Sequence, residues 1–145
     1  MPFPSDRKVS KLSLPIRLSE CDLMGIVHHA QYVIYLEEAR IHFAKEIGID
    51  FATVVREGFN LAVIDLQISY KRPLLFGQVV DIYCWLQELK SRGMTFNFEL
   101  RTNDLEATHA TAQVGLLSVS NTGMPTRIPD PYFQSLQATI NSVDN

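Results

Sequence analysis

The chain has 145 residues, a length typical of one domain that buries about two-thirds of the surface its unfolded form exposes. Its hydrophobic fraction of 46% and charged fraction of 20% are ordinary for a globular protein, and a net charge of −3 gives no basic footprint for nucleic acid. The first residues lack the apolar segment of a signal peptide, and the apolar runs are too short to span a membrane. We therefore expect a cytoplasmic protein that binds neither nucleic acid nor membrane.

The two cysteines do not indicate a structural disulfide. Cys21 and Cys84 lie in dissimilar contexts and form no CxxC pair. We therefore expect free thiols rather than a disulfide framework or a thiolate metal site. The sequence shows no internal repeat or linker, so we expect one domain over residues 1–145. Within it, residues 1–9 are polar with two prolines, and we expect a loose N-terminal segment there.

The first regular element is predicted as a strand between Ser10 and Ser19. Apolar residues alternate there in part, as in a half-buried strand, at Leu12, Leu14, Ile16 and Leu18. Because Pro15 has no N–H to donate, this strand is expected at a sheet edge or as an irregular one.

A long helix is predicted from about Ala30 to Ile47, a stretch without glycine or proline. Its apolar residues recur at three- and four-residue steps, at Tyr32, Tyr35, Leu36, Ala39, Phe43 and Ile47. Val33, Ile34 and Ile41 lie off this stripe, so we expect other elements to enclose most of the helix. Its length of roughly 27 Å would cross a small domain.

The chain after Gly58 is predicted to be mainly strands, at Leu61–Tyr70, Val79–Leu89, Met94–Thr102 and Ala107–Val119. Turn-forming residues separate them, at Arg72-Pro73 and Gly77, at Ser91-Arg92-Gly93 and at Asn103-Asp104. Short turns imply antiparallel neighbours. One helical turn is expected within residues 49–58, and a short amphipathic helix at about residues 130–140. We predict an α+β fold in which a curved antiparallel sheet wraps the long helix and dimerises through its edge.

Asp22 is the first candidate for a catalytic role. It stands at a predicted strand end, just before a turn loosened by Gly25 and the N-terminus of the long helix. Free backbone N–H groups and the positive end of the helix dipole favour a carboxylate there, and equally an oxyanion developing on a substrate. Two interpretations stay open: Asp22 caps the turn, or it acts as nucleophile or general base beside donors that polarise a carbonyl.

The neighbouring side chains give weaker signals. In a strand Cys21 points away from the face of Asp22, so packing is favoured over a role as thiol nucleophile. Glu20 shares the face of Asp22 and either raises its pKa or is solvated. His28 and His29 have no third ligand at suitable spacing, which favours shaping of a pocket over metal binding, and we predict no metal site.

Basic residues flank two of the predicted turns, as Lys71-Arg72 and Lys90-Ser91-Arg92. Such clusters are ordinarily solvated, but two of them also suit the phosphates of an extended anionic substrate. The chain contains no GxSxG elbow, GxGxxG turn or Walker-type lysine loop, so three common enzyme classes lose their main sequence support.

The segment Asp22-x-x-Gly25-x-Val27-x-His29-x-x-Tyr32, followed by Glu37-x-Ala39-Arg40, resembles the opening motif of the hotdog-fold acyl-CoA thioesterases, in the 4-hydroxybenzoyl-CoA thioesterase branch. The later Tyr70-x-x-Pro73-x-x-Phe76-Gly77 and the strand order are similar to the same family, so the resemblance covers about residues 10–135. It implies hydrolysis of an acyl-CoA thioester to a carboxylic acid and free CoA, without a cofactor.

The resemblance also implies roles for individual residues. Asp22 matches the catalytic carboxylate, which attacks the thioester or activates water. The helix-start N–H that polarises the carbonyl falls on His29, and Gly25 permits the close approach. His28 stands where this branch often has an aromatic residue, which bears on acyl preference. Substrate contacts are expected from His28, Tyr32, Glu37, Lys90 and Arg92, the last two matching the basic residues that bind CoA phosphates.

The fold of this family implies homodimers, often homotetramers, with each pocket between subunits. Aromatic acyl groups are slightly favoured, and short or medium aliphatic acyl-CoA or acyl-carrier-protein thioesters are the alternative. A hotdog dehydratase fits poorly, because His29 lies eight or nine residues from Glu37 or Glu38. A non-catalytic acyl-CoA-binding module of the same fold is the alternative from another class.

Overall fold

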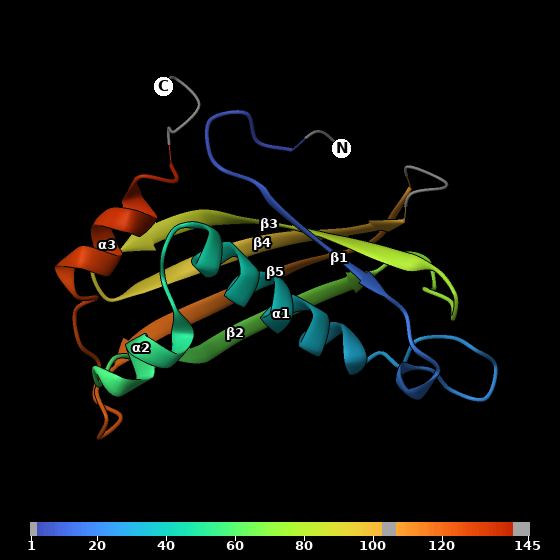
Figure 1. The fold of residues 1–145 in the computed structure, drawn as a ribbon, viewed down its shortest axis with the longest axis horizontal. Helices are drawn as coiled ribbons and strands as arrows, with labels where there is room; N and C mark the ends of the chain where they lie inside the picture. Colours follow the sequence, from blue (N-terminus) through green and yellow to red (C-terminus); the bar gives the residue numbers. More distant parts are fainter. Residues whose placement is uncertain (1–2, 103–106, 141–145) are drawn as a thin grey trace.

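The computed structural model of the chain describes residues 3–102 and 107–140 (Figure 1). Its strands are β1 (Ser10–Pro15), β2 (Asn60–Tyr70), β3 (Val79–Lys90), β4 (Gly93–Thr102) and β5 (Thr108–Val119). Its helices are α1 (Gln31–Glu46), α2 (Phe51–Arg56) and α3 (Asp130–Gln137), with a short 3₁₀ helix, η1, at Leu18–Glu20. The predicted turn at Asn103-Asp104 lies outside the described residues.

The five strands form one antiparallel sheet in the order β1-β3-β4-β5-β2, which confirms the predicted α+β architecture. Helix α1 lies across one face of the sheet (Figure 1), and its Phe43 packs edge-on against Phe96 of β4, with ring centroids 5.3 Å apart. Ile82, Leu100 and Ala110 stand side by side in this register and are fully buried. Because β1 and β2 are the outer strands, the sheet of a single chain ends in two edges.

Helix α1 follows the predicted spacing but is enclosed on one face only. Its buried residues are Tyr32, Tyr35, Leu36, Ala39 and Phe43, the predicted stripe apart from Ile47. Val33 and Ile34 are instead 41% and 50% exposed. The expectation of an almost fully enclosed helix is therefore wrong for a single chain, because the sheet covers only one side of the cylinder and nothing in the described chain covers those two side chains.

The N-terminal region differs from the sequence prediction in two ways. The first strand ends at Pro15, and the chain then turns into η1, because the Glu20 carboxylate accepts hydrogen bonds from the backbone and side chain of Arg17. Residues 3–9 were expected to be loose, yet Arg7 donates to the carbonyls of Leu86 and Gln87 at the end of β3. Neither the local bonds between Arg17 and Glu20 nor the distant bonds of Arg7 leave a trace in the hydrophobic period.

Candidate active site

The carboxylate of Asp22 closes the loop between η1 and α1. Its Oδ1 accepts hydrogen bonds from the N–H groups of Met24, at 2.8 Å, and Ile26, at 3.1 Å. Its backbone N–H donates to the Ile26 carbonyl at 2.9 Å. Within the described chain Oδ2 has no hydrogen-bond donor, and the residue is partly exposed. Asp22 therefore caps the loop with one oxygen, as one interpretation predicted, and keeps the other oxygen available.

Gly25 gives this loop its shape. Its φ of +77° lies in the left-handed region that side chains disfavour. Its carbonyl accepts the N–H of Phe76 at 2.9 Å, and the N–H of Val27 donates to the Leu74 carbonyl at 2.9 Å. The loop is thus fastened at two points to the segment that leads into β3, which limits how far Asp22 can move.

Glu20 fixes the same loop from the inside. Only 6% of the residue is exposed, and its Oε1 accepts the hydroxyl of Tyr35 on α1 at 2.8 Å. Burial by itself would raise the pKa of the Glu20 carboxyl, but hydrogen bonds from the Arg17 backbone, Tyr35 and the Arg17 side chain hold that pKa below its usual value. Glu20 therefore turns inward as a structural anion and does not share a face with Asp22, contrary to the sequence interpretation.

The start of α1 offers hydrogen-bond donors beside this loop. The N–H of His28 is used, because it donates to the Glu20 carbonyl at 3.0 Å. Among the described residues the N–H of His29 has no acceptor, while its carbonyl accepts the Tyr70 hydroxyl at 2.9 Å. A free N–H at a helix N-terminus is the group that sequence analysis placed there for an oxyanion.

The two histidines line different hollows. The Asp22 hollow, of about 680 Å³, is lined by His28, Asp22 and Gly25 together with Leu18, Cys21, Leu23 and Met24. A second hollow, of about 300 Å³, is lined by His29, Tyr32, Tyr70 and the segment 71–73. Tyr32 is 3% exposed and packs edge-on against Tyr70, with ring centroids 4.9 Å apart. The structure thus brings the predicted residues near the loop together, with Asp22, Gly25 and His28 at one hollow and His29 and Tyr32 at the other.

Three other predicted site residues lie elsewhere. Glu37 is exposed on α1, one turn before Arg40. Lys90 and Arg92 line a separate hollow of about 360 Å³ at the turn between β3 and β4, and Lys90 pairs with Glu88 at 3.1 Å. The twelve residues of β3 separate this turn from the Asp22 loop, which at about 3.3 Å per residue is roughly 36 Å. Within one chain the structure does not bring the predicted phosphate-binding pair to Asp22.

Sequence reasoning did not assign two residues that hold the site together. Tyr35 was predicted only as part of the apolar stripe, and its hydroxyl bond to Glu20 spans fifteen positions. Tyr70 was noted only within a family motif, and its bond to the His29 carbonyl crosses forty-one positions. Neither pairing has a local spacing signal, because both depend on how α1 lies across the sheet.

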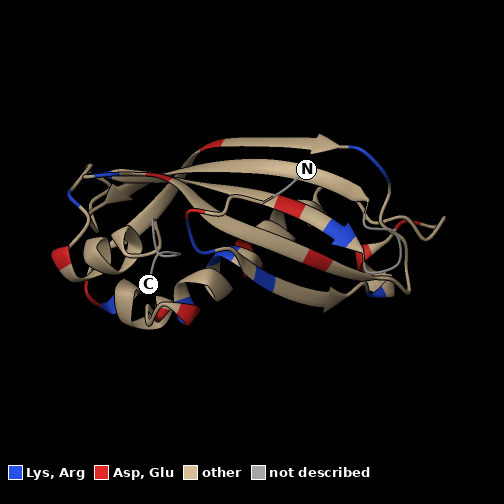
Figure 2. Cartoon of the chain, turned by 90° about the horizontal axis from the view of Figure 1, so that it is seen from above, with Lys and Arg blue, Asp and Glu red and all other residues tan. Residues whose placement is uncertain are grey.

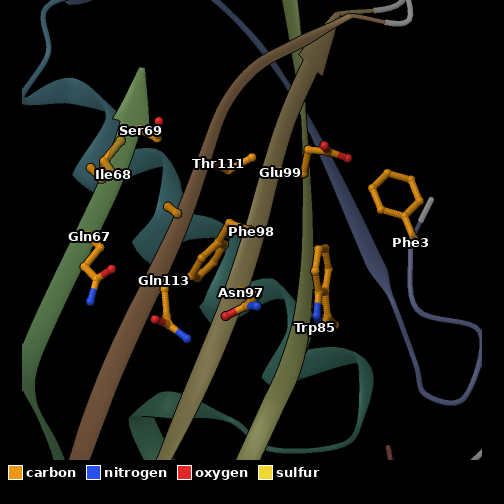
Figure 3. A pocket seen from close by; sticks show the side chains of 11 residues that line it. Phe3, Gln67, Ile68, Ser69, Trp85, Asn97, Phe98, Glu99, Thr111 and Gln113 are labelled. Atoms are coloured by element: carbon orange, nitrogen blue, oxygen red, sulfur yellow. The ribbon is translucent and has the colours of Figure 1, made fainter. Parts of the chain in front are cut away.

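A further hollow of about 460 Å³ lies on the outer face of the sheet, away from α1 (Figure 3). Trp85, Asn97 and Gln113 form a row across three neighbouring strands there, and Phe3 closes one side by stacking on Tyr83 at 4.3 Å. A polar outer face is usual for an antiparallel sheet with one covered side. This hollow contains none of the predicted site residues.

The remaining histidines and the helices bear on metal binding and membrane crossing. Within residues 3–102 and 107–140, no group of three or more histidine, cysteine or acidic side chains is placed to hold a metal ion. Two histidines outside the site have other partners: His42 pairs with Glu46 along α1, and His109 contacts Thr102 and the Pro73 carbonyl in the core. None of the helices in the described residues is long and apolar enough to cross a membrane.

Comparison with known proteins places this arrangement in a family. The profile of the Thioesterase-like superfamily matches residues 16–138. A Bacillus subtilis protein with the provisional name acyl-CoA thioesterase YneP is 30% identical over 92 residues, which cover 63% of this chain and 67% of that protein. A hypothetical protein from Thermus thermophilus superposes with a TM-score of 0.85 at 29% identity, over 90% of this chain and 98% of the other.

A DHNA-CoA thioesterase from Staphylococcus aureus has the same fold, with a TM-score of 0.82 at 23% identity over 90% of this chain and 91% of that one. The chain belongs to the Thioesterase-like superfamily, with the hotdog fold, and is a thioester hydrolase.

Proposed function

We propose that the protein is an acyl-CoA thioesterase in which Asp22 is the catalytic carboxylate. The main support for the proposal is that the two carboxylate oxygens of Asp22 have different partners. Its Oδ1 is held by two loop N–H groups, while Oδ2 has no donor among the described residues. The capping bonds keep the carboxylate in place without using all of its acceptor capacity, which suits a nucleophile or a general base.

The N–H of His29 supplies the second component. A thioester carbonyl oxygen placed at the start of α1 accepts this N–H, and the positive end of the helix dipole stabilises the oxyanion that develops. Asp22 then either attacks the carbonyl carbon, expelling CoA thiolate and leaving an anhydride for water to open, or removes a proton from an attacking water. Both routes end in a carboxylic acid and free CoA.

A homodimer brings the phosphate-binding residues to this site. The outer strand β2 exposes Val63, Ile64 and Leu66 at 53%, 62% and 41%. Val33 and Ile34 on α1 are exposed as well. Pairing two β2 edges about a two-fold axis would cover such an edge and set the Lys90 end of one copy beside the Asp22 end of the other. We therefore assign the CoA phosphates to Lys90 and Arg92 of the second copy.

The second hollow favours an aromatic acyl group. Tyr32 and Tyr70 present their rings beside the His29 backbone, and Tyr70 is 49% exposed. Aromatic rings pack well edge-on or offset against such surfaces. His28 lines the neighbouring Asp22 hollow and directly precedes His29 in the sequence. We expect its side chain to influence which ring substituents the site accepts.

Substitution of Asp22 by asparagine tests the proposal. Asparagine keeps an oxygen that can accept the Met24 and Ile26 N–H groups, so the loop is expected to stay closed while the charge is lost. We expect release of thiol from acyl-CoA to fall by at least about 100-fold, with an unchanged melting temperature. Asp50→Asn, which alters an exposed carboxylate before α2, is the matched control. Full activity in Asp22→Asn would contradict the assignment.

A panel of substrates then separates the remaining possibilities. Benzoyl-, hydroxybenzoyl- and phenylacetyl-CoA are compared with butyryl-, hexanoyl- and octanoyl-CoA and with the same acyl groups on acyl carrier protein. Faster turnover of the aryl set would support the assignment of the second hollow. Tight binding of all the esters without any release of thiol would identify a non-catalytic binding module instead.

A further inference from the structure

An apolar cavity of about 120 Å³ lies beneath α2, at the other end of α1 from the Asp22 loop. Side chains from three helices and the sheet line it, among them Ile41, Val54, Phe59, Phe96 and Leu136. None of the residues that line the Asp22 hollow takes part. A cavity with mainly apolar walls binds an apolar group more readily than water.

Arg40 is the one cationic side chain among the residues that line this cavity. Three arginines of the described chain are partly buried, and two of them pair with carboxylates: Arg7 with Asp6 at 2.9 Å and Arg101 with Glu99 at 2.7 Å. Arg40 has no carboxylate within ion-pair distance among the described residues. Burial lowers the pKa of Arg40, opposed in part by the electrostatic influence of Glu37. A partly desolvated cation that forms no ion pair with a described carboxylate is unfavourable, so this position suits an incoming anion.

We propose that this cavity and Arg40 form a binding site for a small apolar monocarboxylate of about the size of benzoate. The apolar walls would take the ring and the guanidinium would take the carboxylate, an arrangement in which arginine forms two parallel hydrogen bonds. An engineered cavity of about 150 Å³ accepts benzene. The volume near 120 Å³ is somewhat smaller, so it limits the ligand to at most one ring or a short alkyl group.

The ligand has the chemistry of the acid that the proposed reaction releases, and in that respect the inference rests on the proposed function. The site is nevertheless separate from Asp22, so binding and turnover are measured independently. Occupancy of this site by a product acid would depend on the acid concentration and would affect the packing of α1 and α2. These helices lie at the end of the chain whose Lys90 and Arg92 we assign to the CoA that is bound at the Asp22 site of the other copy.

The test is titration of the full chain with benzoate. Calorimetry measures the affinity and chemical-shift changes locate the binding site, and benzamide is the uncharged probe of the same shape. A ligand this small is expected to bind with a dissociation constant of about 1 mM. Shifts are expected at Val54, Phe59 and Leu136 and not at Asp22 or His28. We expect Arg40→Gln to weaken benzoate binding by at least about tenfold, the loss of a charge-assisted pair, and to leave benzamide binding unchanged.

Two further variants keep the test decisive. Arg56→Gln changes an exposed arginine on α2 that does not line the cavity, and it is expected to bind benzoate like the wild type. Ala44→Leu fills the cavity, and it is expected to abolish benzoate binding with Arg40 intact. Equal binding by Arg40→Gln, shifts confined to the Asp22 loop, or no binding by the wild type would overturn the proposal. A change of oligomeric mass in Arg40→Gln would overturn it too, because a carboxylate of a second copy would then be the partner.

The two proposals fail separately. If the wild type releases no thiol from any acyl-CoA but binds benzoate through Arg40, the proposed function fails and this site stands. If Asp22→Asn loses turnover and the wild type does not bind benzoate, the catalytic assignment stands and this site fails.

Discussion

The hydroxyl of Tyr35 donates a 2.8 Å hydrogen bond to Oε1 of Glu20, two residues before Asp22. The Glu20 carbonyl in turn accepts the N–H of His28, one residue before the proposed oxyanion donor. A single buried residue thus links α1 to both halves of the proposed catalytic apparatus. Its effect on catalysis acts through position and not through contact with the substrate.

Tyr35→Phe is expected to lower stability and turnover together. Removing one hydrogen bond to a buried carboxylate costs about 1.5–3 kcal/mol, measurable by urea unfolding. Because the Asp22 loop loses a support, kcat is expected to fall more than KM rises. Tyr83→Phe, which removes a hydroxyl on the outer face of the sheet, serves as control. If Tyr35→Phe kept full kcat at its reduced stability, Glu20 would be a structural anchor only.

The depressed pKa of Glu20 gives stability a defined pH dependence. Its folded pKa lies below the ordinary value of 4.5, so the ionised group contributes stability that is fully present above about pH 4.5. This contribution is lost as the pH falls through the folded pKa. We expect the stability difference between the wild type and Glu20→Gln to be constant from pH 7 to about pH 5 and to shrink below that range. Urea unfolding at a series of pH values measures it, and a pH-independent difference would contradict the assignment.

Gly25→Ala and Gly48→Ala form a matched pair. Both glycines have positive φ, +77° and +84°, and an added Cβ meets no atom within 4 Å at either position. Each substitution is therefore expected to cost about 1 kcal/mol through backbone strain alone. Only Gly25→Ala should reduce turnover, because Gly48 lies beyond the far end of α1. Equal activity in the two variants would show that the shape of the Asp22 loop is not limiting.

Lys90→Gln with Arg92→Gln tests the assignment of the CoA phosphates. Loss of two charge-assisted contacts is expected to raise KM for acyl-CoA by about tenfold or more, with little change in kcat. The same acyl group on N-acetylcysteamine lacks the nucleotide phosphates and should be hydrolysed equally by both proteins. A similar loss on both substrates would instead indicate damage to the fold.

Mixing two proteins that are each impaired at low acyl-CoA concentration tests whether the site is shared between copies. Asp22→Asn is combined with the Lys90→Gln/Arg92→Gln protein under conditions that exchange subunits. If each site takes Asp22 from one copy and the phosphate-binding pair from the other, the mixed dimer regains one fully native site. Activity at low acyl-CoA concentration should then exceed the sum of the two separate proteins. No recovery, with exchange verified by mass, would show that each chain works alone.

Much of the fold was predictable because the spacing of apolar residues and the position of turn residues indicate the helices and strands. The three- and four-residue spacing from Tyr32 to Phe43 set α1 to within one residue at each end, and the turn residues separated β2, β3 and β4. Asp22 and Gly25 were placed by their position between strand and helix. The inward turn of Glu20 was not predictable, because its bonds to Arg17 override strand alternation.

The separation of Lys90 from Asp22 could not be predicted from the sequence either. Both lie beside turns, but whether two turns meet depends on strand direction and order, which local spacing does not encode. β3 runs from the Asp22 end of the sheet to the opposite end, as Figure 1 shows. In the view of Figure 2 the Lys and Arg positions, in blue, are spread over several elements among the Asp and Glu positions, in red.

The capping bonds of Asp22 have a consequence for evolution. The Met24 and Ile26 N–H groups need an oxygen at position 22, and an amide oxygen satisfies them as well as a carboxylate does. Selection for folding therefore accepts aspartate or asparagine there, and under the proposed function only selection for turnover distinguishes them. On that proposal a gene duplicate could lose catalysis by one nucleotide change and keep its fold, so overall similarity to this chain would not reveal which copies still react.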